Sequence, residues 1–357
     1  MKVKLGDVCD KASSNIRQKD IIDGSGNYPI YGAAGKLGLV DFYQQDNSYI
    51  GVVKDGAGIG HTVLLPPKSS VIGTMQYLIP KENVLPEYLY YVVKHMHLEK
   101  FQTGATIPHI YFKDYKNVTF DLVPIERQKQ IVEQFSKIER LLQVREQQLS
   151  NLDTLIKARF VEMFGDPVKN TKKFGLIKLS DLGLLERGKS KHRPRNDPAL
   201  LGGPYPLIQT GEVTNSGVYI KDYSSTYSDL GLAQSHMWPK GTLCITIAAN
   251  IAQTAILNFD ACFPDSVVGF IPNDNSISTI YLHYWFTFFQ KILDAQAPQV
   301  AQKNINLKIL SNLKVIVPPL LLQQEFASFV HQVDKSKVVV KKISKFHNIS
   351  QEMCVND

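Results

Sequence analysis

The sequence contains one pattern of segments twice in the same order, and a duplication constrains the fold more than any single motif does. VKLGDVC at Val3–Cys9 reappears as IKLSDLG at Ile177–Gly183. Five further matches are YPIYGAAG with YPLIQTGE, GIGHTVLL with NIAQTAIL, LIPKEN with FIPNDN, PEYLYYVV with TIYLHYWF, and HIYFKDYKNVTFDLVP with NINLKILSNLKVIVPP. The offset grows from 174 residues at Val3 to 195 at His109, within polar, Gly-rich segments. We therefore predict two domains of one fold that differ in their loops.

Short segments rich in β-branched and aromatic residues, bounded by Gly, Pro, Asn and Asp, predict strands in both copies. Examples are SYIGVVK and HTVLLP in the first copy, and GTLCITI and AQTAIL in the second. The aromatic-rich segments EYLYYVVKHMHLEKF and IYLHYWFTFFQKIL predict one helix in each copy. Each copy is therefore expected to be a mixed α/β domain, and the whole chain belongs to the α+β class.

A long helical segment follows a proline after each copy. In VPIERQKQIVEQFSKIERLLQVREQQLSNLDTLIKARFVEMF, ten positions follow alternating steps of four and three residues, and eight of them are apolar. These positions are Ile131, Phe135, Ile138, Leu142, Arg145, Leu149, Leu152, Ile156, Arg159 and Met163. Because this spacing is typical of a coiled-coil seam, we predict a coiled-coil helix about 60 Å long.

The second segment, PPLLLQQEFASFVHQVDKSKVVVKKISKFHNISQEM, keeps the seam less regularly, because Lys337 and Ser344 stand at two seam positions. Its apolar seam positions include Phe326, Val330, Val333 and Val340. We predict that the two long helices pair as an antiparallel coiled coil within the chain and relate the copies by a pseudo-twofold internal repeat. The alternative is that each helix covers its own domain.

The predicted organisation has five parts, because GDPVKNTKKFG has the composition of a solvated linker. They are a first domain at 1–123, a coiled-coil helix at 124–164, a linker at 165–176, a second domain at 177–318 and a second coiled-coil helix at 319–357.

Composition excludes several classes of protein. An apolar content of 44% with 20% charged residues is typical of folded globular domains, and no apolar run has the length of a membrane span. The start, MKVKLGDVCD, lacks a signal-peptide pattern, so we expect a cytoplasmic protein. The four cysteines, Cys9, Cys244, Cys262 and Cys354, show neither CxxC nor zinc-ligand spacing and are expected to be free thiols. A net charge of +7 favours a polyanionic partner but also suits an ordinary soluble protein.

Three patterns resemble catalytic or metal sites. Gly183, Gly188, Lys189 and Ser190 match GxxxxGK[ST], but the prolines of the following KHRPRNDP oppose the helix that a phosphate loop needs. GAGIG at Gly56–Gly60 precedes an expected strand and is interpreted as a tight turn. The HMH triplet has no third metal ligand in the sequence around it. The sequence also lacks NPPF-like or DPPY-like methyltransferase motifs and a nuclease-type carboxylate cluster, so we expect a chain without catalytic or metal-binding residues.

The densest basic segment is ERGKSKHRPRNDP, with five cations in nine residues. Arginine forks can bind guanine O6 and N7, and cations neutralise phosphates, so this segment is a candidate DNA contact. Its candidate residues are Arg187, Lys189, Lys191, His192, Arg193 and Arg195. The matched segment KASSNIRQKD is milder but still basic, and Arg17 is its candidate. The alternative is a charged loop that is merely solvated.

Amide, hydroxyl and basic side chains recur in the expected loops of both copies, where they can contact bases or phosphates. The candidates in the first copy are Lys36, Lys54, His61, Thr106 and His109. Those in the second copy are Gln209, Thr210, Asn250, Gln253, Gln299, Gln302, Lys303 and Asn304. Such residues often only satisfy turns, so about half of them are expected to lie away from DNA.

The duplicated arrangement resembles the specificity subunits of Type I restriction-modification systems over almost the entire chain. The resemblance rests on the VKLGD and IKLSD openings, the YPI and YPL strands, GTLCITIAAN followed by ACFPDSVVGFIP, and the helix starts VPIERQKQIVEQF and VPPLLLQQEF. The second copy departs at its helix start, where LLLQQEF replaces IERQKQI. This departure affects the expected pairing of the helices rather than the resemblance.

The resemblance implies two target-recognition domains that recognise the halves of a bipartite double-stranded DNA target, with the helices setting the distance between the halves. It implies two methyltransferase subunits that use S-adenosylmethionine to methylate adenine, and ATP- and Mg-dependent restriction subunits, around a chain that is itself non-catalytic. The alternative is a stand-alone bivalent DNA-binding or scaffold protein without methyltransferase partners. Such a protein would not need unpaired apolar positions on the outer faces of its helices.

Overall fold

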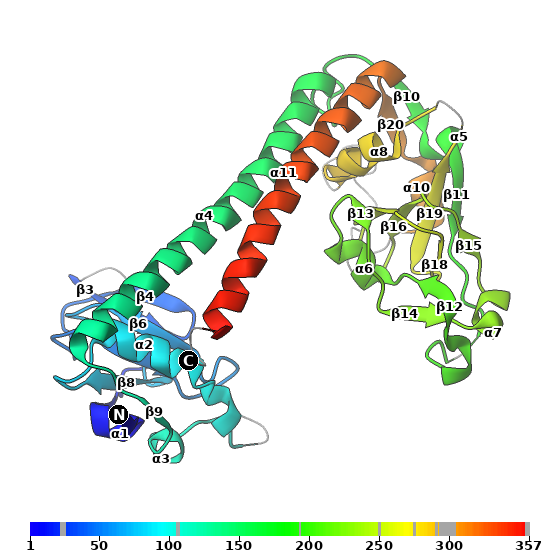
Figure 1. Cartoon of the computed structure of the whole chain (residues 1–357). Helices are drawn as coiled ribbons and strands as arrows, with labels where there is room; N and C mark the ends of the chain where they lie inside the picture. Colours follow the sequence, from blue (N-terminus) through cyan, green and yellow to red (C-terminus); the bar gives the residue numbers. More distant parts are fainter. Residues whose placement is uncertain are drawn as a thin grey trace. The chain divides into compact units, whose positions relative to one another are not determined.

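A computed structural model describes residues 1–21, 26–104, 108–192, 194–248, 251–273, 276–289, 292 and 305–353. The chain divides into two compact units, Met1–Gln143 and Val144–Asp357. Both units combine helices with short strands (Figure 1), which confirms the mixed α+β class predicted from the sequence.

The first unit is built on a four-stranded antiparallel sheet with the order β2-β8-β5-β6. A second sheet has the order β4-β3-β7, and β1 pairs separately with β9. The strands are β1 (Lys2–Lys4), β2 (Cys9–Ser13), β3 (Tyr28–Gly32), β4 (Gly35–Val40), β5 (Tyr49–Val53), β6 (Thr62–Leu65), β7 (Ser70–Val71), β8 (Met75–Pro80) and β9 (Thr119–Asp121). The helices are α1 (Leu5–Val8), η1 (Gln18–Asp20), α2 (Pro86–His95), η2 (Leu98–Phe101) and α3 (Phe112–Tyr115).

Strand β5 is buried over its whole length because both faces of its sheet are covered. Successive side chains of a strand point to opposite faces. Ile50 and Val52 accordingly share a buried cluster with Leu89 of α2, whereas Tyr49 and Val53 share another with residues of β7 and β8. This double cover explains why the segment YIGVV is continuously apolar.

The second unit contains a five-stranded sheet with the order β11-β19-β16-β17-β13 and a four-stranded sheet with the order β14-β12-β18-β15. Its strands are β10 (Gly175–Lys178), β11 (Gly183–Arg187), β12 (Leu201–Leu207), β13 (Tyr219–Ile220), β14 (Ser225–Tyr227), β15 (Met237–Trp238), β16 (Leu243–Thr246), β17 (Thr254–Leu257), β18 (Ala261–Cys262), β19 (Val267–Pro272) and β20 (Lys314–Val317). Its shorter helices are α5 (Leu179–Leu182), η3 (Pro198–Leu200), α6 (Thr210–Asn215), α7 (Asp229–Ala233), α8 (Thr279–Phe286) and α10 (Leu307–Asn312).

The segments matched in the sequence form matching strands. In the first unit β2, β8, β5 and β6 are neighbours in that order, and their counterparts β11, β19, β16 and β17 follow the same order in the second. The pair β1–β9 likewise corresponds to the pair β10–β20. The additional strand β13 pairs parallel with β17, so the second copy extends its sheet by one strand.

Two long helices, α4 (Ile125–Phe164) and α11 (Leu320–Met353), follow the two copies of the module. Within the second unit the C-terminal part of α4 packs against α11, which Figure 1 shows alongside it. Asp153 pairs with Lys337 at 2.7 Å, and Arg159 pairs with Glu325 at 3.2 Å. Because the partner's number falls as the number on α4 rises, this pairing is antiparallel.

Aromatic residues fill the contact between these helices and the second domain. The rings of Phe160 and Phe164 each lie 5.4 Å from that of Phe326, and both also contact Tyr281 of α8. Phe160 and Phe164 stand outside the predicted seam, whereas Ile156 on the seam is fully buried. The buried face of α4 therefore packs against both α11 and the second domain.

The N-terminal part of α4 packs against the first domain. Ile131 contacts the buried cluster of that domain, and the ring of Phe135 stacks on Tyr91 of α2 at 4.9 Å. The alternative considered from the sequence, a helix that covers its own domain, therefore describes this part of α4.

Each long helix is tied to its own domain by a fully buried glutamine. Gln128 accepts a hydrogen bond from the Leu85 amide at 2.9 Å and donates to the carbonyls of Asn83 and Val123. Gln323, at the matched position of the second copy, accepts from the Ser278 amide at 2.8 Å and donates to the Pro318 carbonyl at 2.8 Å. Leu85 and Ser278 are the N-caps of α2 and α8, so each glutamine joins the starts of two helices.

Several local predictions are changed by the structure. The helix expected over residues 87–101 ends at His95, because His97 adopts a left-handed conformation with φ of 51° before η2. Of the helix expected over residues 280–293, α8 accounts for the part up to Phe286, a turn follows at Thr287 and Phe288, and residues 290, 291 and 293 lie outside the described residues. Strand β10 begins at Gly175, so the last two residues of the expected linker pair with β20.

The remaining local predictions concern the glycine turn, the thiols and the helices. GAGIG forms the tight turn between β5 and β6, where the Gly60 amide donates to the Val53 carbonyl at 2.9 Å, as predicted. Cys9, Cys244 and Cys262 are buried free thiols, and burial raises the pKa of Cys9 to about 12; Cys354 lies outside the described residues. In the part of the chain that the structure describes, no helix is long and apolar enough to span a membrane.

We predict that Gln323→Leu lowers the free energy of unfolding by about 1–3 kcal/mol, because it leaves the partly buried Ser278 amide and the buried Pro318 carbonyl without this partner. Chemical denaturation of the purified chain measures this change. Gln324→Leu is the matched control, because Gln324 is exposed on the same helix. Equal stability of the two variants would contradict an anchoring role for Gln323.

Candidate nucleic-acid interface

The basic segment, defined as residues 187–195, runs from the end of β11 towards η3 in the second unit. Its backbone is held by the turn that follows α7. The Ser235 hydroxyl donates to the Lys189 carbonyl at 2.9 Å, and the Gln234 side-chain oxygen accepts from the amides of Lys191 and His192 at 2.6 and 3.1 Å. The described part of the segment is thus an irregular loop held by these hydrogen bonds.

The phosphate-loop match in this segment does not form a phosphate loop. Gly183–Arg187 is strand β11, antiparallel to β19, and the next helical turn in the described chain is the three-residue η3 at Pro198–Leu200. A phosphate loop requires a strand before its glycines and a helix immediately after its Lys and Ser or Thr. In the described residues, no helix follows Lys189 and Ser190 directly, as expected from the prolines.

The cations of the basic segment differ in their surroundings. Arg187 donates from Nε and Nη2 to the Asp265 carbonyl at 2.9 and 2.6 Å, and Arg195 donates from Nη2 to the Asp265 carboxylate. Lys189 and Lys191 are exposed, and both carry mobile single charges suited to phosphate contacts. Arg193 lies outside the described residues.

His192 is paired within the same loop. Its Nε2 lies 3.0 Å from Oδ2 of Asp197, and Oδ1 of the same carboxyl group accepts from the Ala199 amide at 3.0 Å. The hydrogen bond from that amide, together with the one from His192, holds the pKa of the Asp197 carboxyl below its ordinary value. Part of the positive charge expected from the sequence is therefore balanced locally.

In the first unit, the turn between β5 and β6 gathers a second group of candidates. Asp55 lies between Lys54 Nζ at 2.8 Å and His109 Nδ1 at 2.6 Å. Partial burial acts to raise the pKa of the Asp55 carboxyl, but the hydrogen bonds from Lys54 and His109 outweigh it and lower that pKa. The structure thus brings together Lys54 and His109, two residues separated widely in the sequence.

An exposed aromatic residue extends this group. The ring of Tyr111 stacks beside His109 with centroids 6.4 Å apart, and Lys113 Nζ lies 5.3 Å from the Tyr111 ring centroid. Tyr111 is 50% exposed, which is unusual for an aromatic residue next to several buried ones. Cations interleaved with an exposed ring are suited to a nucleic-acid surface.

The other candidates of the first copy lie on separate elements. Lys36 is exposed on β4, Arg17 is exposed between β2 and η1, and His61 is exposed beside the β5–β6 turn. Thr106 lies outside the described residues.

The amide candidates of the second copy include residues with local structural tasks. Gln209 caps α6 in a reciprocal arrangement with Glu212, and the Thr210 carbonyl accepts from the Thr214 hydroxyl at 2.8 Å. Gln253 is exposed at the β16–β17 turn, where its amide donates to the Thr246 hydroxyl oxygen at 3.1 Å. Asn250, Gln299, Gln302, Lys303 and Asn304 lie outside the described residues.

Sequence reasoning missed Asp265, Gln234, Tyr111 and Lys113. Asp265 stands in the ACFPDSVVGFIP segment that carries the family resemblance, but a single carboxylate offers no signal that it will bind two arginines. Tyr111 and Lys113 are part of the repeated HIYFKDYKNVTF segment, and their alternation with His109 is visible in the sequence. That alternation could have been recognised as a basic and aromatic stripe.

Comparison with known proteins identifies the family. A family model described as the Type I restriction modification DNA specificity domain matches residues 1–153 and again residues 171–345. The chain belongs to this family. The two matches fall on the two copies of the repeated module.

The specificity subunit is similar to two proteins of Methanocaldococcus jannaschii. It is 24% identical over 320 residues to the Type I restriction enzyme MjaVIII specificity subunit, covering 81% of this chain and 72% of that protein. It is 21% identical over 289 residues to the putative type I restriction enzyme MjaX specificity subunit, covering 74% and 67% respectively.

Two solved structures share the fold of the specificity subunit. The S subunit of a Type-I restriction-modification system from M. genitalium is similar with a TM-score of 0.61 and 16% identity, over 99% of this chain and 94% of that one. A chain from a structure on complex assembly and conformational transition of the type I R-M system has a TM-score of 0.57 and 15% identity, over 99% and 95%.

We predict that replacing both Lys189 and Lys191 by Ala weakens binding of the specificity subunit to any duplex DNA and lowers the slope of log affinity against log salt by about 2, because each phosphate contact contributes about 0.9. Binding titrations at several salt concentrations measure the slope. Lys169→Ala with Lys172→Ala is the matched control, since both lysines are exposed in the turn after α4. An unchanged slope would exclude the basic segment as a phosphate contact.

Proposed function

We propose that this specificity subunit recognises a bipartite double-stranded DNA target, one half with each of its two target-recognition domains, and holds methyltransferase subunits on its long helices. The observation that carries the proposal is that the family match occurs twice, on two modules with the same strand order. Equivalent modules can present equivalent surfaces to two identical partners related by a pseudo-twofold axis.

The loops of the two modules support separate target halves. The first module has the group Lys54, His109 and Tyr111, whereas the second has the basic segment, in which Arg187 and Arg195 bind Asp265. The scaffold strands correspond while these loops differ in chemistry. Two different half-sites are therefore the expected target. In this proposal the paired helices α4 and α11, which we interpret as an antiparallel coiled coil, set the distance between the two half-sites.

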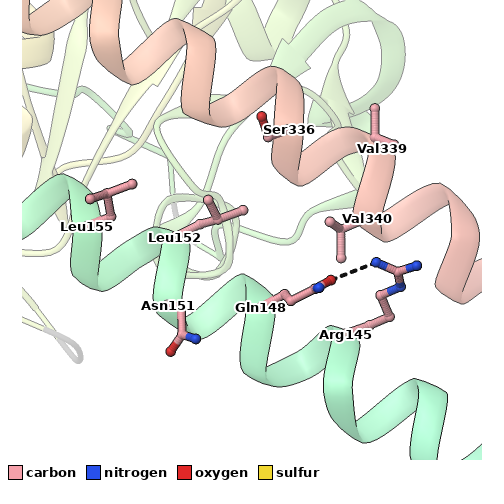
Figure 2. Close-up of a pocket in the computed structure, with 8 residues that line it drawn as sticks. All are labelled: Arg145, Gln148, Asn151, Leu152, Leu155, Ser336, Val339 and Val340. Atoms are coloured by element: carbon pink, nitrogen blue, oxygen red, sulfur yellow. Dashed lines mark hydrogen bonds between the residues drawn. The ribbon is translucent and has the colours of Figure 1, made fainter.

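The helices also carry apolar side chains that their own chain leaves exposed. The exposed fractions are 48% for Leu155, 42% for Val161 and 59% for Val339. A groove of about 720 Å³ lies between α4 and α11 (Figure 2). It is lined by Arg145, Gln148, Asn151, Leu152, Leu155, Ser336, Val339 and Val340. Exposed apolar positions of this kind are typical of interfaces and favour the subunit over a stand-alone scaffold.

In this proposal the chemistry belongs to the partners. Methyltransferase subunits would supply S-adenosylmethionine-dependent methylation of adenine, and restriction subunits would supply ATP- and Mg-dependent cleavage. The specificity subunit contributes position and sequence choice in the cytoplasm. Stand-alone DNA binding without these partners is the second candidate.

We predict that the purified chain with S-adenosylmethionine leaves DNA unmethylated, whereas the chain with its methyltransferase subunit methylates adenine at a two-part site. Transfer of labelled methyl groups to DNA, followed by sequencing of the modified positions, measures both results and identifies the target. Methylation by the chain alone would contradict the division of labour. A methyltransferase subunit that modifies the same site without the chain would contradict the role in recognition.

We predict that Leu155→Asp weakens association with the methyltransferase subunit at least about tenfold, because a charge at an apolar contact must be desolvated. Analytical ultracentrifugation of the mixed subunits measures the association. Thr154→Asp is the matched control, because Thr154 is exposed on the adjacent position of α4 and does not line the groove. Association of Leu155→Asp with the same affinity as Thr154→Asp would place the interface elsewhere.

A further inference from the structure

A chain of contacts in the second domain leads from the sheet to one exposed arginine. Arg187, the last residue of β11, fixes the main chain at Asp265 by donating two hydrogen bonds to its carbonyl. The Asp265 carboxylate in turn accepts from Nη2 of Arg195. The guanidinium of Arg195 is therefore positioned through Asp265 by a strand of the central sheet.

Glycine at position 188 permits this arrangement. The Gly188 amide donates to the Val267 carbonyl at 2.9 Å, next to the turn that carries Asp265. A Cβ atom at position 188 would lie 2.2 Å from the Phe263 carbonyl oxygen and 2.4 Å from that of Pro264. Any other residue would clash with these two carbonyl oxygens. Glycine at position 188 therefore permits the end of β11 to lie against the turn that carries Asp265.

The pair of Asp265 and Arg195 is not needed by the shared scaffold. The side chains are 34% and 45% exposed, and ion pairs this exposed contribute little to stability. The first copy has Gly73 at the position matched to Asp265, two residues before β8, just as Asp265 stands two residues before β19. The Asp265 carboxylate is therefore a feature of the second domain that the first domain lacks.

A carboxylate bound to one edge of a guanidinium group restricts the orientation of its remaining N–H donors. Arginine has five N–H donors in a planar fork, and Nη2 of Arg195 is engaged by Asp265. A fork held in this way loses less freedom when it donates to guanine O6 and N7 than a mobile side chain does. The same carboxylate repels the phosphates that would otherwise compete for Arg195.

We propose that Asp265 is a positioning residue that makes Arg195 a specificity-determining contact to guanine in the half-target of the second domain. The inference rests on the proposed function, because it requires that this domain contacts base edges. Arg187 supports Asp265, Asp265 orients Arg195, and Lys189 and Lys191 supply the contacts to phosphates.

The test uses the chain assembled with its methyltransferase subunit and duplexes that carry the target found by methylation sequencing. For Asp265→Asn we expect affinity for the target to fall roughly tenfold, the loss of one well-placed base contact. Affinity for non-specific DNA stays equal or rises, and the lost preference is confined to one G·C pair of one half-target. Asp222→Asn is the matched control, with the same change of charge at an exposed position of the same domain.

Arg195→Lys tests the same contact without altering Asp265. It keeps the charge but lacks the fork, so we expect the same lost preference at the same base pair with an unchanged salt slope. In an Arg195→Ala background, Asp265→Asn should have no further effect on that preference.

The outcomes separate the inference from the function on which it rests. If the unaltered assembly selects its target while Asp265→Asn and Arg195→Lys keep every base preference, the inference is overturned and the function stands. If the unaltered assembly shows no preference between the target and non-specific duplexes, the proposed function itself fails. A uniform loss of affinity for both duplexes would assign Asp265 a purely structural role and would also overturn the inference.

Discussion

The structure depends on how each long helix is joined to a globular domain, and a buried glutamine makes that joint twice. Gln128 and Gln323 are both fully buried, and each satisfies the N-cap amide of a domain helix together with carbonyls beside its own helix start. Removing one partner of such a network leaves the others unpaired in a low-dielectric interior, which is energetically costly. This cost favours a single arrangement of the helix start on its domain. A shift of the helix start along the domain would therefore break several hydrogen bonds at once.

This joint also shows what a matched pair of sequences can and cannot reveal. The helix starts VPIERQKQ and VPPLLLQQ differ at several positions, and the difference obscured the glutamine that both contain. The duplication itself, the mixed composition of each domain, the turn at GAGIG and the long helices were all predictable, because they depend on periodicity and turn residues. The aromatic contacts of Phe160 and Phe164 were not, because these residues lie off the seven-residue pattern and are selected by the domain surface.

The candidate interface was only partly predictable for a related reason. Counting cations located the basic segment, and the structure describes most of it as an exposed loop. Counting cations could not show which of them are already paired within the protein. Arg187 and Arg195 bind Asp265, which is distant in the sequence, and Lys54 binds Asp55 through the conformation of one turn. Arg193, Thr106, Asn250 and the candidates at 299–304 lie outside the described residues, and the DNA contacts of all the candidates stay predictions.

The packing of α4 has a consequence for the order in which the chain acquires its structure. Its N-terminal part packs on segments that precede it, so the first core can close once Gln128 and Phe135 have been synthesised. Phe160 and Phe164 complete their contacts with Tyr281 and Phe326, residues made more than a hundred positions later. During synthesis these two rings lack those later partners, and a nascent chain exposes them to water and to other chains. The second half of one continuous helix is therefore a part of the nascent chain that stays open to aggregation until the second domain is complete.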